Sequence, residues 1–415
     1  MPQKLTEECL ADIVAPNETL FIPGSAGAPL AFLADLLRKP ERSRNAKLLT
    51  SFIPGINTID IDQLDPSVSI TGMFTQPAFT RAQRDGRFRA LPVSYAGFVS
   101  HLRDNVDIGL TVVQLSEPDS NGQCSLGPAV EFMPVALQKS RRVLGLINRR
   151  TPRIPGAVSV PYDKLDYVCE VDTPLPEYNV TGDDVTQAIA RNIAQLIPDG
   201  AAFQIGLGKV PAALSTLLCD RKNLRLHSGM LSDGMIELAE AGALDPNFPP
   251  TTCVLVGTDR FYRWAANYDG LRILGCDFTH DPRTLLGLDG FIAVNSALEV
   301  DLFGQCNLEF VDGRAVSGAG GAPDFARCAR LSRGGRSIVA LNASYSKGSR
   351  ILPCLTEKAI TSLLRVDVDA IITEFGIANL IGASVHERAQ AIISVAAPEF
   401  REELQRAWST IAARL

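Results

Sequence analysis

Short apolar runs alternate with amphipathic segments along the chain. In the first half, the apolar runs predict buried strands at residues 20–22, 47–53, 68–72, 109–115 and 143–148. Between some of these runs, residues 29–37 and 78–84 have the character of helices. Buried strands that alternate with helices are typical of parallel α/β sheets. The pattern therefore predicts an α/β fold with mostly parallel sheets.

A second series of elements begins near residue 181. Apolar residues recur there at helical spacing, at Val185, Ile189, Ile193, Leu196 and Ile197, and Pro198 follows them. Thr181 and Asp184 have the spacing of a capping box, which predicts where this helix begins. The next predicted elements are a strand at 201–205, a glycine turn, a helix opened by Pro211, a strand at 223–226 and a helix at 235–243.

The segment between the two series, residues 173–178, contains two prolines and reads as a linker. We therefore expect an N-terminal domain at residues 1–175 and a C-terminal domain at 181–415. The second series begins with helix, strand, glycine turn and helix, and this order loosely repeats that of residues 8–40. The two domains are thus predicted to be similar open α/β domains.

Composition narrows the class of protein. The chain has 415 residues, of which 46% are hydrophobic and 21% charged, as in ordinary globular proteins with room for two cores. A net charge of -6 argues against binding to nucleic acid or to a membrane surface. No apolar run reaches the roughly 18–20 residues that span a bilayer, and the acidic N-terminus does not resemble a secretory signal. We expect a cytoplasmic protein.

Cysteine and histidine patterns give no sign of a metal site. Nine cysteines are scattered without any Cys-x-x-Cys pair, and the chain has four histidines. Structural zinc sites usually need clustered ligands of these two types. We expect reduced, mostly buried thiols and no bound metal.

The most informative stretch is His227–Gly234, which reads His-Ser-Gly-Met-Leu-Ser-Asp-Gly. It lies between a predicted strand and a predicted helix, where α/β enzymes commonly place their chemistry. Two glycine-rich segments accompany it. One is Gly206-Leu207-Gly208, which follows a strand, and the other is Gly318-Ala319-Gly320-Gly321. Such segments let backbone amides approach an anion or an oxyanion.

These segments and their flanks resemble family I CoA-transferases, in particular the acetyl-CoA hydrolase/transferase branch with its 4-hydroxybutyrate and acetate CoA-transferases. The similar stretches, in chain order, are 118–127, 204–211, 227–234, 295–305, 317–325 and 373–380. The resemblance implies two α/β domains with an acyl-CoA site at their interface. It also implies an oxyanion and acyl loop at Gly206, Leu207 and Gly208.

The same resemblance implies where CoA binds. The loop Gly318, Ala319, Gly320 and Gly321 corresponds to the stretch that lies against CoA in the family, with Ala322 at the position of the family's glutamine. Lys347 and Arg350 stand where the family has basic residues, and they are candidates for binding the CoA phosphates. Glu374, in the C-terminal stretch, reads as a structural carboxylate.

One position departs from the family. The branch reads His-Thr-Glu-Met-x-Ser-Asp-Gly at 227–234, and its glutamate is the covalent nucleophile that forms an acyl anhydride and then a glutamyl-CoA thioester. This chain has Gly229 there. We expect the catalytic position at His227, Ser228 and Gly229, but the covalent route cannot start at a residue without a side chain.

Three outcomes fit this departure. In the first, another group takes over, and the candidates are His227 acting as a base, Glu131 and Glu309. In the second, the space admits water or a bulkier acceptor, which would give a hydrolase or a biosynthetic acyltransferase. In the third, the protein binds a CoA thioester without turning it over. Acyl or CoA transfer by a different route is the leading hypothesis, and hydrolysis is the next.

The expected partners are therefore small molecules: an acyl-CoA and an acyl or CoA acceptor. CoA is expected as a substrate and no cofactor as a permanent ligand. We expect neither nucleic acid nor membrane as a partner. A homodimer is the assembly considered, and the sequence leaves the oligomeric state, the acyl group and the acceptor open.

Overall fold

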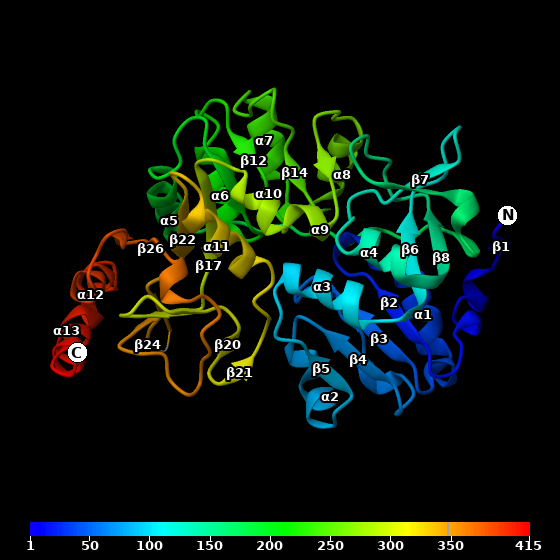
Figure 1. Ribbon diagram of the computed structural model, residues 1–415, viewed down its shortest axis with the longest axis horizontal. Helices are drawn as coiled ribbons and strands as arrows, with labels where there is room; N and C mark the ends of the chain where they lie inside the picture. Colours follow the sequence, from blue (N-terminus) through cyan, green and yellow to red (C-terminus); the bar gives the residue numbers. More distant parts are fainter. Residues whose placement is uncertain (347) are drawn as a thin grey trace. The chain divides into compact units, whose positions relative to one another are not determined.

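The computed structural model describes residues 1–346 and 348–415, and the chain folds into two compact units, each with its own sheet (Figure 1). The first unit comprises Met1–Asn179 and Thr251–Thr279. The second comprises Val180–Pro250 and His280–Leu415. None of the helices in the described parts of the chain is long and apolar enough to cross a membrane.

The first unit is built on an eight-stranded sheet whose strands all run parallel. In spatial order these strands are β1 (Gln3–Lys4), β10 (Tyr167–Val171), β8 (Ser140–Asn148), β6 (Ile108–Leu115), β2 (Thr19–Ile22), β3 (Lys47–Thr50), β4 (Ser69–Gly72) and β5 (Phe88–Ala90). The predicted strands at 20–22, 47–53, 68–72, 109–115 and 143–148 are all present within a few residues. The parallel sheet that the apolar runs indicated is thus confirmed.

Helices accompany the sheet in this unit, and some of them cover it with apolar side chains. They are α1 (Leu30–Arg38), α2 (Thr80–Arg84), α3 (Tyr95–Asn105), α4 (Met133–Lys139), α8 (Asp259–Ala266) and α9 (Cys276–Thr279). Phe32 and Leu36 of α1 share a hydrophobic cluster with Leu20 and Ile22 of β2, and all four side chains are fully buried. α4 packs on β6 and β8. Apolar burial of this kind is the main source of stability for the unit.

The predicted C-terminal domain, a continuous 181–415, differs from the structure in one segment. Thr251–Thr279 belongs to the first unit because its backbone pairs with that unit. The amides of Val130 and Glu131 both donate to the carbonyl oxygen of Cys253, at 3.0 and 3.1 Å. In turn, the amide of Cys276 donates to the carbonyl oxygen of Glu131 at 2.7 Å. Periodicity in the sequence reports local structure and does not reveal such long-range pairing.

The second unit is built on a six-stranded sheet. Its strands, in spatial order, are β12 (Arg225–Leu226), β11 (Ala202–Ile205), β17 (Phe291–Ser296), β22 (Arg336–Ala340), β26 (Ala370–Thr373) and β27 (Gly376–Asn379). All neighbours pair in parallel except β26 and β27, which form an antiparallel edge. The C-terminal stretch 373–380 therefore closes this sheet as a strand and turn, as the sequence predicted.

The helices of the second unit are α5 (Asp184–Ala194), α6 (Lys209–Leu217), α7 (Gly234–Glu240), α10 (Pro282–Leu286), α11 (Ala322–Leu331), α12 (Val385–Ser394) and α13 (Pro398–Ala412). The start of α5 corrects one expectation. Its cap is Asp183, whose carboxylate accepts a hydrogen bond from the amide of Thr186 at 2.9 Å, and not Thr181. A carboxylate at the N-cap also interacts favourably with the helix dipole.

Candidate functional site

The loop Gly206-Leu207-Gly208 follows β11, the strand at which the order of strand addition in the second sheet reverses. The chain runs from β11 to β12 on one side of it, and later adds β17 on the other side of β11. In open α/β sheets, ligands bind at the carboxyl ends of strands at such a reversal. Gly208 has φ +130°, a backbone conformation that side chains disfavour, and it leads directly into α6. The loop therefore offers backbone amides at a helix N-terminus.

His227, Ser228 and Gly229 follow the neighbouring strand β12. The amide of His227 donates to the carbonyl oxygen of Phe203 at 3.0 Å. The hydroxyl of Ser228 donates to the carbonyl oxygens of Ile205, at 2.5 Å, and Met230, at 3.0 Å. Since Gly206 follows Ile205, these bonds bring the glycine loop and Gly229 together. The Ser228 side chain is fully buried, and its hydrogen bonds link the ends of β11 and β12.

Gly229 faces the ring of His280, a residue that the sequence analysis did not single out. A Cβ atom at position 229 would lie 3.1 Å from His280 Nε2 and 3.4 Å from Cε2 of Phe325. Real Cβ atoms seldom approach other groups as closely as 3.1 Å. A side chain at 229 would therefore require the imidazole of His280 to shift by a few tenths of an ångström.

The second glycine-rich segment meets the same ring. A Cβ atom on Gly321 would lie 2.5 Å from His280 Nε2, closer than packing permits. Gly321 directly precedes α11, and its carbonyl oxygen accepts from the amide of Phe325 at 3.1 Å. Gly229 and Gly321 therefore both lie against His280. The rest of the segment, Gly318, Ala319 and Gly320, leads up to this point.

His280 is buried against an aromatic ring, and its burial determines its protonation state. Its ring centroid is 4.6 Å from that of Phe325, and only 1% of the residue is exposed. Burial, together with a smaller electrostatic contribution from neighbouring His227, lowers the pKa of His280 to about 3. His227 is itself buried and meets Phe291 edge-on at 6.5 Å. At neutral pH, His280 is therefore an uncharged imidazole.

The basic residues predicted for CoA phosphates are placed only in part. Lys347 lies outside the described residues. Arg350 is half-buried, donates from Nη1 to the carbonyl oxygen of Leu298 at 2.9 Å, and lies over the ring of Tyr345 at 5.2 Å. These contacts fix the guanidinium, and its role toward phosphate stays a prediction.

The alternative carboxylates lie in different units. Glu309, in the second unit, accepts from the Ser362 hydroxyl at 2.7 Å, and burial raises its pKa. Glu131 is in the first unit and is almost fully buried, with hydrogen bonds from the hydroxyls of Ser25 at 2.5 Å and Ser51 at 3.0 Å. Burial outweighs these two bonds and raises the pKa of Glu131 to about 7.

Glu374 has the structural role that the sequence predicted. Its carboxylate accepts a hydrogen bond from the amide of Ala343 at 2.9 Å. This bond ties the turn between β26 and β27 to the segment that follows β22. Glu374 is therefore engaged in holding the sheet edge.

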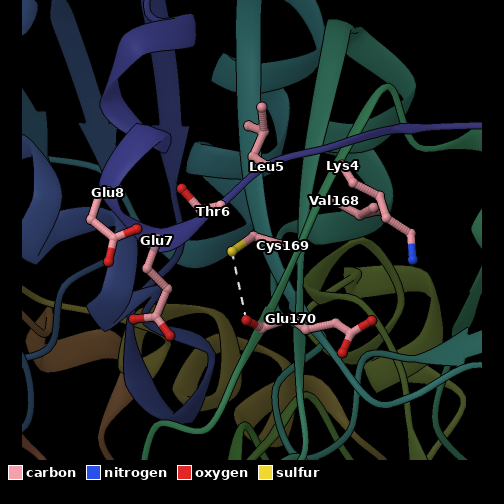
Figure 2. A pocket seen from close by; sticks show the side chains of 8 residues that line it. All are labelled: Lys4, Leu5, Thr6, Glu7, Glu8, Val168, Cys169 and Glu170. Atoms are coloured by element: carbon pink, nitrogen blue, oxygen red, sulfur yellow. Dashed lines mark hydrogen bonds between the residues drawn. The ribbon is translucent and has the colours of Figure 1, made fainter.

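A separate hollow lies beside the edge strand β1 and its neighbour β10 in the first unit (Figure 2). Figure 2 shows the carboxylates of Glu7, Glu8 and Glu170 around it, and Lys4 is the single basic residue of its lining. Three carboxylates against one ammonium group repel the phosphates of CoA. This hollow contains none of the residues predicted for the site.

Comparison with known proteins gives matches along most of the chain. The family model for the acetyl-CoA hydrolase/transferase N-terminal domain matches residues 2–176, and the model for the C-terminal domain of the same name matches residues 257–408. A relative, the 4-hydroxybutyrate coenzyme A transferase of Clostridium kluyveri, is 37% identical over 308 residues, which cover 72% of this chain and 71% of the relative.

Two solved structures are similar over the whole length. RipA from Yersinia pestis superimposes with a TM-score of 0.91 at 28% identity, covering 99% of this chain and 98% of that one. The 4-hydroxybutyrate CoA-transferase from Porphyromonas gingivalis gives a TM-score of 0.81 at 25% identity, with 100% and 98% covered. The α/β architecture of both units thus agrees with that of these two structures, one of which is a CoA-transferase.

Proposed function

We propose that this chain, which belongs to the acetyl-CoA hydrolase/transferase family, transfers CoA or an acyl group from a CoA thioester without a glutamyl nucleophile at position 229. The observation that carries the proposal is the close approach of His280 to Gly229. Gly229 has no side chain, and the imidazole ring of His280 lies beside it. A covalent glutamyl intermediate therefore cannot form there.

The route that remains is direct transfer between two bound substrates. The carboxylate of the acceptor attacks the thioester carbonyl carbon, the C–S bond breaks, and CoA thiolate and a mixed anhydride result. The thiolate then attacks the acceptor's carbonyl carbon in the anhydride, which releases the original acyl group as a carboxylate. No net proton transfer is needed, so the site requires positioning and oxyanion stabilisation more than a strong base.

The glycine segments have distinct roles in this proposal. Gly206, Leu207 and Gly208 present backbone amides to the oxyanion that forms during attack. Gly318, Ala319, Gly320 and Gly321 approach the CoA moiety, and Lys347 and Arg350 bind its phosphates. Charge reversal at both basic residues, Lys347→Glu with Arg350→Glu, is expected to weaken CoA binding in a salt-sensitive way. Unchanged affinity in that double variant would remove both residues from the site.

Initial-rate kinetics test the direct route. With butyryl-CoA and acetate varied together, and acetyl-CoA formation followed by chromatography, direct transfer gives intersecting reciprocal plots because both substrates bind before reaction. A covalent enzyme intermediate gives parallel, ping-pong plots. Intersecting plots support the proposal, and parallel plots would show that another residue of this chain forms the intermediate.

Hydrolysis is the second candidate function, because water can take the place of the carboxylate acceptor where Gly229 supplies no glutamyl nucleophile. The same reactions distinguish the two activities. Acetyl-CoA that forms only with acetate indicates transfer, whereas free CoA that appears without acetate indicates hydrolysis. Tight binding of butyryl-CoA with neither product would indicate a binding protein and would contradict both activities.

A further inference from the structure

A hollow in the second unit, here called the arginine hollow, is lined by Arg330, Arg365, Arg388 and Asp369 together with apolar side chains. Its volume of about 350 Å³ is in the range of small-molecule sites. Asp369 directly precedes β26, whereas Gly206 directly follows β11. Because the strands from β11 to β26 run parallel, these two points lie at opposite ends of the sheet. The arginine hollow is therefore separate from the glycine loop, and its lining contains none of the residues assigned to CoA chemistry.

The charges of the arginine hollow do not balance. Among the described residues that line it, Asp369 supplies the one carboxylate, and it faces three guanidinium groups. Three positive charges and one negative charge leave a net charge of +2. The Asp369 carboxylate is buried, pairs with Nε of Arg330 at 2.9 Å and accepts from the amide of Ser337 at 3.0 Å. It is thus engaged by one arginine and by the backbone, and the other two arginines keep their charge.

Arg365 presents an accessible guanidinium group. The residue is exposed, and its guanidinium lies over the ring of Phe303 at 5.8 Å. The carboxylate nearest in sequence, that of Asp367, accepts from Nη2 of Arg327 at 2.7 Å instead. In the described parts of the chain, no carboxylate forms an ion pair with Arg365. Its N–H donors are therefore available as a fork that fits two oxygens of an anion.

Arg388 contributes a positive charge whose position is fixed. The residue is half-buried, and its Nη2 donates to the carbonyl oxygen of Arg365 at 2.8 Å. Two further backbone carbonyl oxygens accept from its guanidinium, each at 3.4 Å. Burial lowers the pKa of Arg388, and the positive charges of Arg365 and Arg330 act in the same direction against the opposing effect of Asp369. An anion bound beside these like charges relieves their repulsion.

We propose that the arginine hollow binds a small molecule with a doubly charged oxyanion group, the chemistry that phosphate monoesters and dicarboxylates share. Two negative charges match the net charge of the lining. Arg365 and the terminal nitrogens of Arg330 bind the oxyanion, and Arg388 supplies a fixed positive charge. Phe303 and Val366 form apolar walls for the organic part of the ligand. The inference does not rest on the proposed function, because binding in this hollow requires no turnover.

The first test measures the binding of phenyl phosphate, a phosphate monoester, and of succinate, a dicarboxylate, by isothermal titration calorimetry. At least one probe should show saturable binding, and the probe that binds identifies the class of ligand. Arg365→Glu should weaken this binding about tenfold or more, because it removes a charge-assisted fork and adds repulsion. The control is Arg406→Glu, the same charge change at an exposed arginine of α13 outside the lining, and it should change the affinity less than about twofold. No saturable binding of either probe at millimolar concentration, or equal weakening in the two variants, would overturn the inference.

The second test locates the bound probe in the native protein and does not depend on the folding of a variant. Phenylglyoxal modifies exposed arginine side chains, and peptide mass spectrometry measures the rate at each position. A saturating probe should slow the modification of Arg365 several-fold and leave that of Arg406 unchanged. An unchanged rate at Arg365 in the presence of a bound probe would place the ligand elsewhere and overturn the inference.

The affinity for butyryl-CoA separates this inference from the proposed function. Arg365→Glu should leave that affinity unchanged, because the arginine hollow lies at the other end of the sheet from the glycine loop. A loss of butyryl-CoA affinity as large as the loss for the probe would make the hollow part of the CoA site and would overturn the inference of a second site. If the native protein binds the probe at Arg365 but turns over no CoA thioester, the proposed function fails and the second site stands.

Discussion

Replacing the buried carboxyl group of Glu131 by an amide should change how the stability of the first unit depends on pH. Only 2% of Glu131 is exposed, and its two oxygens accept hydrogen bonds from Ser25 and Ser51. In Glu131→Gln the shape is kept and the charge is removed. The amide oxygen can accept from one serine while the amide nitrogen donates to the other.

The direction and size of the effect follow from the pKa of this group. The ordinary value is 4.5, and burial raises it to about 7 in the folded protein. Between these two values the folded protein keeps a proton that the unfolded chain has lost, so stability falls as pH rises. The difference corresponds to about 3 kcal/mol, which is fully lost above pH 7. The Gln variant lacks this loss.

We therefore expect the free energy of unfolding of Glu131→Gln, relative to the native side chain, to rise by about 3 kcal/mol between pH 4.5 and pH 8. The measurement is urea denaturation followed by tryptophan fluorescence. The chain has two tryptophans, Trp264 in the first unit and Trp408 in the second. A Trp408→Phe background isolates the signal of the first unit.

The matched control is Glu170→Gln, which makes the same substitution at an exposed carboxyl group of the same unit. A difference between Glu131→Gln and the native side chain that stays constant across this pH range would refute the reasoning. It would mean that Glu131 is ionised in the folded protein at acidic pH, and that its two serine hydrogen bonds outweigh its burial.

Three further predictions concern the second unit, with Trp408 as the probe in a Trp264→Phe background. The pKa of His280 is about 3 in the folded protein, against an ordinary value of 6.5. The free energy of unfolding of the native protein should therefore fall by about 4 kcal/mol as pH falls from 6.5 to 3.5, and that of His280→Gln should not. Equal acid sensitivity of the two proteins would contradict this prediction. Gly208→Ala should lower the free energy of unfolding, measured by urea denaturation, by about 1–2 kcal/mol because Gly208 has a φ of +130°. Gly206→Ala should be nearly neutral, because there is open space around the Cβ position of Gly206. Equal costs for the two variants would contradict the assignment of strain to Gly208. Ser228→Ala should lower the free energy of unfolding by about 1–2 kcal/mol, because a buried carbonyl group loses its hydrogen-bond donor. Its kcat should change little. A large loss of kcat at unchanged stability would instead mark Ser228 as catalytic.

Much of the fold was predictable because parallel buried strands leave a local signature. Runs such as 109–115 and 201–205 are apolar on both faces of the sheet, and they appear as β6 and β11. The helix at 184–194 was also visible in its periodicity, although its cap was assigned to Thr181 and is Asp183. Neighbouring polar residues at a helix start compete for the cap, and only the backbone geometry decides between them.

The return of Thr251–Thr279 to the first unit was not predictable in this way. It depends on backbone hydrogen bonds such as those to Cys253, between residues far apart in the chain. In the candidate site too, residues in local motifs could be named from the sequence, whereas a residue placed only by folding could not. The segments around Gly206, Gly229 and Gly321 carried motifs and were found, whereas His280 carried none. His280 packs against two of these glycines, Gly229 and Gly321, and this relation exists only in the folded unit.

The central claim, CoA thioester chemistry without a glutamyl nucleophile, is tested most directly by searching for the covalent intermediate under turnover. The native protein is incubated with butyryl-CoA and acetate, quenched in acid during steady-state acetyl-CoA formation, and mapped by peptide mass spectrometry. Direct transfer gives turnover with no CoA or acyl adduct on any aspartate or glutamate. A CoA adduct on a carboxylate, at Glu131, Glu309 or elsewhere, would contradict it and would identify a relocated nucleophile.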